Sequence, residues 1–198
     1  MSGVPGAGKT TIARELARHR GLVALDRDVV LTAMLETDGA DVEQDGAFTF
    51  ARVASYSVVK ALADDVLSQG LGVIIDSPCF YDELLADGQA LAAKHGVAYR
   101  YIECVTEDIA LIDTRLRSRP ALRSQRVSVD QPPIDLAADR ERPGSDLFAD
   151  GFANMKRPDT YLRLDTTQPL DECVAKALAF LDSAELGASG VGQQPADA

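Results

Sequence analysis

A glycine-rich stretch near the start of the chain, GVPGAGKT at residues 3–10, limits the possible folds more than any other feature. Its spacing is G-x-x-x-x-G-K-[ST], in which glycines let successive backbone N–H groups turn toward a phosphate and a helix begins directly afterwards. Apolar residues at helical spacing over residues 10–20 predict that helix, and Gly21 predicts its end. A dinucleotide-binding loop is excluded, because the third glycine it requires would stand where Thr11 stands.

The stretch predicts a binding loop for nucleotide phosphates and Mg²⁺. Lys9 is expected to reach the β and γ oxygens, and the Thr10 hydroxyl is expected to bind Mg²⁺. The residues predicted to contact the nucleotide here are Gly3, Pro5, Gly6, Ala7, Gly8, Lys9, Thr10 and Thr11. The alternative, an ordinary glycine-rich turn, gives no packing reason for a lysine and a threonine at a helix start.

Apolar runs alternate with helical periodicity along the rest of the chain. Strands are expected at residues 22–25, 72–76, 98–104 and 160–165, and helices at 10–20, 29–35, 48–69, 81–94, 108–117 and 170–181. Such alternation predicts an α/β fold, a parallel sheet with helices on both faces. The run GVIID at residues 72–76 suits a strand buried on both faces.

The length of 198 residues predicts one domain, which we expect to span residues 1–183, with a disordered polar tail at 184–198. Four prolines interrupt the region from about 118 to 145, where we predict a lid. The first strand is largely missing, since only Met1 and Ser2 precede the loop. We therefore expect Met1 to be an internal methionine, preceded by an apolar segment of about four to six residues.

Composition restricts the partners. The formal net charge of −11 makes nucleic acid an unlikely ligand, because phosphate-backbone binding depends on lysine and arginine. No apolar run approaches the roughly 20 residues of a membrane span, and no signal sequence is evident. We expect a cytoplasmic monomer or weak dimer that acts on a small molecule.

The motifs beyond the loop favour transfer to a bound acceptor over hydrolysis. The GTPase motifs D-x-x-G and N-K-x-D do not occur in the sequence. In VIIDSP, Ser77 follows Asp76, whereas an ATPase that activates water would be expected to have glutamate there. Phosphoryl transfer to a hydroxyl needs a carboxylate beside that hydroxyl, cations over the moving group and Mg²⁺.

Carboxylates end two of the expected strands. The run LDRD places Asp26 and Asp28 at the carboxyl end of one strand, where ligands bind in open α/β sheets. Asp28 is the candidate general base, and the alternative is that it only caps the next helix. Asp76 ends a buried strand, and we expect it to order Mg²⁺ through water; a purely structural role is the alternative.

An arginine cluster precedes the predicted lid, in TRLRSRPALRSQR at residues 114–126. Arg115 and Arg119 are four residues apart, so they share one face if the helix continues to Pro120, and both are candidates to clamp the γ-phosphate. Arg123 and Arg126 are further candidates for nucleotide binding. The alternative is a solvated, charged helix end.

These motifs together resemble the P-loop kinases grouped with polynucleotide kinase and zeta toxin, also described as AAA-domain ATP-binding proteins. The resemblance covers roughly residues 2–182 and rests on SGVPGAGKTTIAREL, DRD, GVIIDS, Arg115-x-x-x-Arg119 and LRLDTTQPLDECVAKAL. It implies a three-layer sandwich of the P-loop NTPase type, with a parallel sheet of about five strands and the loop strand at its centre. It also implies a general base at Asp28, phosphate contacts from Arg115 and Arg119, and a segment near adenine at 166–169. The acidic chain lacks the basic channel of polynucleotide kinases, so it most resembles the subgroup without an assigned acceptor.

The sequence thus predicts an ATP- and Mg²⁺-dependent small-molecule kinase. Lys9, Asp28, Arg115 and Arg119 are its expected catalytic residues, with Thr10 and Asp76 at the metal. Two alternatives stay open at this point: a nucleotide-binding regulatory protein without turnover, and a polynucleotide 5′-kinase.

Overall fold

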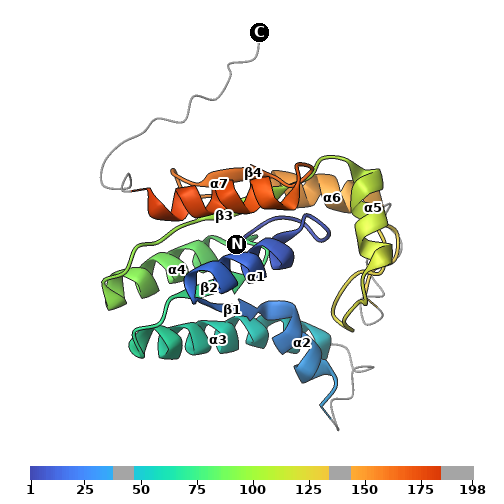
Figure 1. Cartoon of the computed structure of the whole chain (residues 1–198). Coiled ribbons are helices and arrows are strands. Elements are labelled where there is room, and N and C mark those ends of the chain that lie inside the picture. The colour runs from blue at the N-terminus through green and yellow to red at the C-terminus, as the bar shows by residue number, and fades with distance from the viewer. Residues whose placement is uncertain (38–46, 134–143, 184–198) are drawn as a thin grey trace.

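The computed structural model describes residues 1–37, 47–133 and 144–183. The helices are α1 (Lys9–Arg20), α2 (Arg27–Leu35), α3 (Ala47–Ser68), α4 (Asp82–His95), α5 (Ile109–Ser118), α6 (Gly144–Ala153) and α7 (Leu170–Asp182). The strands are β1 (Val23–Asp26), β2 (Val73–Asp76), β3 (Ile102–Val105) and β4 (Leu162–Asp165). The predicted alternation of strands and helices is confirmed (Figure 1).

All strands run parallel, in two pairs. β1 pairs with β2, and β3 pairs with β4. Met1 and Ser2 lie between β2 and β3: the Met1 amino group donates to Ile75 O at 2.9 Å, and Ser2 N donates to Ile102 O at 2.8 Å. The order across the molecule is therefore β1, β2, the segment Met1–Ser2, β3 and β4, with the loop segment in the middle, as expected.

Helices cover this arrangement in two layers. α1 packs against β1, β2 and α7, whereas α3 packs against β1, β2, α2 and α4. α2, α5 and the turn that leads from Ser2 into α1 gather at one end of the molecule (Figure 1). Because parallel strands all end on the same side, the residues that follow β1, β2, β3 and β4 also lie at this end.

The core explains why these helices form where the sequence predicts them. Ile12 and Leu16 of α1 pack in one buried cluster with Ile112 and Leu116 of α5 and with Leu164 of β4. Each helical pair is four residues apart and thus lies on one face. Gly21 ends α1 with a left-handed backbone at φ 63°, as the sequence predicts.

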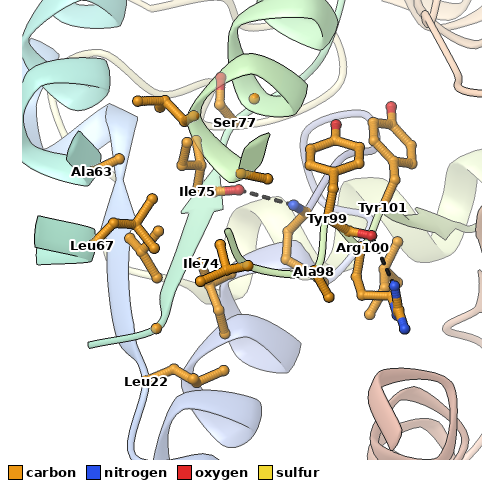
Figure 2. A pocket seen from close by; sticks show the side chains of 18 of the residues that line it. Leu22, Ala63, Leu67, Ile74, Ile75, Ser77, Ala98, Tyr99, Arg100 and Tyr101 are labelled. Carbon is orange, nitrogen blue, oxygen red and sulfur yellow. Dashed lines mark hydrogen bonds between the residues drawn. The ribbon is translucent and has the colours of Figure 1, made fainter. Parts of the chain in front are cut away.

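Two expectations for the strands were wrong in detail. The strand expected at residues 98–104 is regular only from Ile102, because residues 98–101 have β4 on one side at Tyr101 and no strand on the other among the described residues. β2 was expected to be buried on both faces, yet Val73, Ile74 and Ile75 are only half-buried. Both differences arise beside a cavity that residues 72–75 and 98–101 line (Figure 2).

Sequence periodicity also missed one helix. In addition, part of the predicted lid lies outside the described residues. Helix α6 begins at Gly144, directly after a stretch with no periodicity. Residues 119–133 of the predicted lid form turns, whereas 134–143, the polar loop at 38–46 and the tail at 184–198 lie outside the described residues. No described helix is long and apolar enough to cross a membrane.

A buried ion pair joins β3 to the chain that follows α6. Glu103 is 2% exposed, and its two carboxylate oxygens accept hydrogen bonds from Arg157 Nε and Nη2, each at 2.7 Å. The same guanidinium donates to the carbonyls of Met155 and Phe152. The bonds to Glu103 raise the pKa of Arg157, so its guanidinium stays charged at neutral pH.

Removal of the cation from this pair should destabilise the fold strongly. Arg157→Ala leaves the Glu103 carboxylate buried and unpaired, and we expect the free energy of unfolding in urea to fall by about 3 kcal/mol. The matched control is Arg163→Ala, which breaks the pair with Glu107 between side chains that are 55% and 75% exposed. It should change that free energy by less than about 1 kcal/mol, and equal losses would contradict the assignment.

Candidate functional site

The phosphate loop begins between β2 and β3 and needs glycine for steric reasons. Gly3 has φ 135°, and a Cβ atom there would lie 2.3 Å from Cys104 O. Gly6 has φ 79°, and its Cβ would lie 2.9 Å from the Ile112 side chain. Only glycine tolerates these backbone conformations and these close contacts. The loop is therefore held close against β3 and α5.

The start of α1 presents free backbone donors next to the loop. Gly8 is its N-cap, with φ 87° and no side chain that caps the first turn. Lys9 Nζ donates to Val4 O at 3.0 Å, so the lysine folds over the loop, while Thr11 is exposed in the first turn. Uncapped N–H groups and a lysine at one point form a binding site for phosphate oxygens.

Asp76 and Thr10 meet at the end of β2, as the sequence predicts for a metal site. The Thr10 hydroxyl donates to Asp76 Oδ2 at 2.5 Å, and Asp76 is 4% exposed. The other oxygen, Oδ1, is buried and has no hydrogen-bond partner among the described residues. An unpartnered, buried carboxylate oxygen fits Mg²⁺, which uses one or two carboxylates together with substrate phosphates and waters.

The described residues contain no group of three or more acidic, histidine or cysteine side chains that could hold a metal alone. The Mg²⁺ that the family implies would therefore need nucleotide oxygens in addition to Thr10 and Asp76. Such shared coordination is the usual arrangement for Mg²⁺ at phosphoryl-transfer sites.

The cap of α2 is Asp26, and this leaves Asp28 available for another role. Asp26 Oδ1 accepts from Asp28 N at 2.9 Å, so the alternative that Asp28 is the cap is wrong. Burial raises the pKa of Asp26, and the nearby Asp76 and Asp28 raise it further. Asp28 itself is one-third exposed, and its Oδ2 accepts from Gln125 Nε2 at 2.9 Å.

Arg119, at the end of α5, faces the carboxylates of Asp28, Asp26 and Asp76. Burial lowers the pKa of its guanidinium, and Asp28, Asp26 and Asp76, in that order, oppose the shift. Its Nε is buried without a hydrogen-bond partner among the described residues, and its Nη2 has only a 3.5 Å bond to the Arg126 carbonyl. Arg119 is thus a cation with unused donors beside the acidic end of the sheet.

Arg115 does not share the surroundings of Arg119, because α5 ends at Ser118 and Arg119 continues in extended backbone. Arg115 Nη2 donates to Thr166 O at 2.6 Å, and Nη1 donates to Thr106 Oγ1 at 3.1 Å and Gly6 O at 3.5 Å. In this arrangement its donors hold the phosphate loop against the ends of β3 and β4.

Arg123 and Arg126 are likewise engaged with the protein. Arg123 Nη1 donates to Leu35 O at the end of α2, at 2.8 Å, and Arg126 Nη2 donates to Val129 O at 2.8 Å. The Arg126 guanidinium also lies 5.8 Å from the ring centre of Phe148. Their predicted contact with nucleotide stays a prediction.

Two residues of the site were missed at the sequence level, Arg27 and Gln125. Arg27 is 6% exposed, lies 4.1 Å above the Tyr56 ring and approaches Asp28 Oδ1 to 3.8 Å. Gln125 bonds to Asp28. Of the two, only Arg27, between two aspartates in LDRD, had a visible signal. Thr166 was expected only within a segment near adenine, and its Oγ1 bonds to the Ala7 carbonyl of the loop at 2.9 Å.

Comparison with known proteins identifies the family of the chain. The sequence model of the AAA domain family matches residues 1–143, which is most of the chain and includes the phosphate loop, Asp28, Asp76 and Arg119. The chain belongs to this AAA domain family. The match ends within the predicted lid, so α6, β4 and α7 lie beyond it.

Several proteins that are similar to this chain are kinases. A shikimate kinase of Frankia casuarinae is 35% identical over 141 residues, which are 70% of this chain and 55% of that protein. The chain thus spans about half the length of this curated relative. A putative kinase of Chloroflexus aurantiacus and a sugar kinase of Janibacter sp. HTCC2649 have the same fold. The TM-score is 0.62 for the putative kinase and 0.58 for the sugar kinase, and the sequence identities are 23% and 21%. The matches cover 91% and 92% of this chain, respectively, and 92% of each of the two kinase chains.

The raised pKa of Asp26 predicts how this AAA domain responds to pH. A carboxyl group whose pKa is above 3.8 only in the folded protein stabilises the fold at low pH, and this contribution is lost as pH rises through the raised pKa. Asp26→Asn keeps a capping side chain and removes the charge. It should raise the free energy of unfolding in urea more at pH 7 than at pH 4.

Asp165→Asn is the control for that experiment, because its expected effect has the opposite sign. The Thr167 backbone N–H lowers the pKa of Asp165, so its charged form stabilises the fold above the ordinary pKa. This variant should lose stability at pH 7. A loss for Asp26→Asn at pH 7 as well would contradict the electrostatic account of the acidic end of the sheet.

Proposed function

We propose that this AAA domain is an ATP- and Mg²⁺-dependent kinase that transfers the γ-phosphate to a hydroxyl of a small molecule. The observation that carries the proposal is one cluster at the carboxyl end of the sheet. It joins the Thr10 and Asp76 pair, the one-third exposed Asp28 and Arg119. Among the described residues, Asp76 Oδ1 and Arg119 Nε have no hydrogen-bond partner. Similarity to a shikimate kinase and a sugar kinase supports a small-molecule acceptor.

The loop would hold the triphosphate. Backbone N–H groups of the loop and of the first turn of α1 donate to phosphate oxygens, and Lys9 exchanges its bond to Val4 O for the β and γ oxygens. Bound Mg²⁺ would neutralise charge that develops on the phosphates during transfer. Thr10 would contribute a hydroxyl to this ion, and the buried Asp76 Oδ1 would bind it or one of its waters.

Asp28 would orient the acceptor and take its proton. The acceptor oxygen forms a bond to the γ-phosphorus, the bond to the β–γ bridging oxygen breaks, and the hydroxyl proton passes to the Asp28 carboxylate. Gln125 holds one carboxylate oxygen, and Arg27 lies near the other. These contacts would fix the orientation of the carboxylate, as a proton acceptor requires.

Arg119 would stabilise the transferred phosphoryl group. It faces Asp28 and Asp76, and its Nε has no hydrogen-bond partner among the described residues, so a phosphate between it and Lys9 would satisfy this donor. Arg115 supports the same reaction from behind the loop, through Gly6 and Thr166. The two arginines of the R-x-x-x-R pattern are therefore proposed to act on different parts of the site.

Asp28→Asn should separate binding from transfer. The variant keeps the size of the side chain and its bond to Gln125, so ATP affinity by calorimetry should stay within about threefold. Transfer should fall by about 10²-fold or more, which is the usual contribution of a general base. Lys9→Ala, in contrast, should lose ATP binding itself. Full transfer by Asp28→Asn would remove Asp28 from the reaction.

Arg119→Ala should lower the transfer rate with little change in the amount of folded protein, because no protein carboxylate depends on it for a salt bridge among the described residues. Loss of a cation that acts on the transition state is worth about 10²-fold or more. Arg117→Ala is the matched control, since Arg117 is exposed and pairs with Asp113 on α5. Equal effects of the two substitutions would contradict the assignment of Arg119.

The acceptor can be identified by incubation with γ-labelled ATP and separate panels of shikimate, sugars, sugar acids and a short 5′-hydroxyl oligonucleotide. We expect label on a small molecule, lost in Asp28→Asn. Label on the oligonucleotide alone would favour the polynucleotide kinase alternative. ATP binding without label on any acceptor would favour the regulatory alternative.

A further inference from the structure

Two arginines and two tyrosines form a continuous set of contacts on the α3 side of Asp28. The set consists of Arg27 of α2, Arg52 and Tyr56 of α3, and Tyr81, which is the N-cap of α4. We call these four residues the arginine–tyrosine wall. Because α4 follows β2, its N-terminus lies at the carboxyl end of the sheet, where the phosphate loop also lies.

Arg27 connects the arginine–tyrosine wall to the candidate general base. Its Nη1 lies 3.8 Å from Asp28 Oδ1, and its guanidinium carbon lies 4.1 Å from the centre of the Tyr56 ring. Its Nε donates to Ser55 Oγ at 3.1 Å, and its Nη2 donates to the Arg52 carbonyl at 3.3 Å. Arg27 is buried, so these contacts fix the start of α3 and the Tyr56 ring beside Asp28.

Tyr81 adds an accessible aromatic ring to the wall. The rings of Tyr56 and Tyr81 form an edge-to-face pair, with their centres 6.2 Å apart and their planes at 85°. Burial raises the pKa of Tyr56, while Arg27 and a hydrogen bond with the Ser77 side chain oppose the shift. Tyr56 is thus fixed by its surroundings, whereas Tyr81, which packs against it, is 43% exposed and can contact a ligand.

Arg52 carries a charge that no described carboxylate neutralises. Its Nη1 donates to the Tyr81 hydroxyl at 3.3 Å, and it has no ion pair with an acidic side chain among the described residues. Arginines elsewhere in this chain of net charge −11 do pair with carboxylates, among them Arg14, Arg18, Arg20, Arg117, Arg157 and Arg163. An arginine without such a partner in so acidic a chain fits an anionic ligand.

The acidic end of the sheet makes such a cation important for an anionic acceptor. Asp26, Asp28 and Asp76 would repel a carboxylate or phosphate that approached the site without a cation beside it. Arg119, at the end of α5, is proposed above to act on the transferred phosphoryl group. Arg52 lies on a different element, because α3 packs against α2 and α4. It can therefore receive the anionic end of an acceptor whose hydroxyl faces Asp28.

We propose that Tyr81 and Arg52 form the acceptor subsite, and that they take a ring-shaped polyol with an anionic substituent, either a carboxylate or a phosphate. This assignment rests on the kinase function proposed above, since it concerns the molecule that receives the phosphoryl group. The ring packs against Tyr81, and the anion accepts hydrogen bonds from the Arg52 guanidinium. A ring is favoured over an open chain because it loses less conformational freedom when it binds.

The test measures the binding of four probes to the 198-residue chain without nucleotide. Glucose, glucuronate and glucose 6-phosphate share a pyranose ring and differ in one substituent, whereas gluconate carries its carboxylate on an open chain. NMR of isotope-labelled tyrosine side chains follows the binding, and the Tyr81 signal is identified by its loss in Tyr81→Leu. Tyr161, which packs edge-to-face against Tyr101, is the internal control.

Glucuronate, glucose 6-phosphate or both should shift the Tyr81 signal and leave the Tyr161 signal unchanged. The affinity for an anionic ring should exceed that for glucose and for gluconate at least about tenfold, because hydrogen bonds between arginine and an anion are stronger than neutral ones. Tight binding of only one of the two anionic rings supports the proposal and identifies the anion.

Arg52→Gln should weaken the binding of an anionic ring at least about tenfold and leave that of glucose within about twofold, because it removes the charge. Tyr81→Leu should weaken the binding of every ring probe, whereas Tyr81→Phe, which keeps the aromatic ring, should stay within about threefold. Arg18→Gln is the matched control, since Arg18 is exposed and pairs with Glu15 on α1. Urea unfolding checks that each variant is folded.

Equal affinities for glucose and both anionic rings, or gluconate binding as tight as that of glucuronate, would overturn the proposal. An unchanged affinity in Arg52→Gln would also overturn it, because the anion would then bind elsewhere, for example at the phosphate loop. None of these measurements uses phosphoryl transfer. Transfer to a neutral acceptor that Arg52→Gln leaves unchanged would remove the subsite and keep the kinase. Binding of an anionic ring at Tyr81 without transfer to any acceptor would keep the subsite and remove the kinase.

Discussion

The rest of the structure depends on four backbone hydrogen bonds made by only two residues. Met1 bonds to Ile75 and Ser77, and Ser2 bonds to Ile102 and Cys104. They are the only described ladder contacts between the two strand pairs, and they set where the chain leaves the sheet. Gly3 then passes so close to Cys104 O that no side chain fits, which places the phosphate loop against β3 and α5.

The position of the loop in turn organises charge at one end of the molecule. β1 and β2 end at Asp26 and Asp76 in register, so two carboxylates lie side by side and Asp28 follows within one turn. Burial, and then repulsion from Asp76 and Asp28, raise the pKa of Asp26. Thr10 and Arg119 approach this acidic group from α1 and from the end of α5. A net charge of −11 over the whole chain is thus compatible with a local site for anionic phosphates.

Local sequence patterns predicted most of the helices and strands, because each pattern is sufficient by itself to specify its element. Helix α1 follows from its apolar spacing and Gly21, and the loop follows from its glycines. Residues 98–101 could not be predicted in the same way, since a strand becomes regular only when a neighbour pairs with it. Asp26 rather than Asp28 caps α2, because the Asp26 side chain accepts from Asp28 N. The spacing of the two aspartates in LDRD does not show which of them precedes the first helical turn.

The sequence by itself determined the loop, the alternation of strands and helices, and the presence of carboxylates and arginines in the segments that meet at the loop. Spacing along the chain is enough for these features, because they rest on neighbours within a few residues. Only the tertiary structure separated Arg115, which holds Gly6 and Thr166, from Arg119, which faces the carboxylates. It also brought Gln125 to Asp28, across 97 positions of the chain. Such choices depend on which distant groups are close enough to satisfy a donor, and sequence spacing does not contain that information.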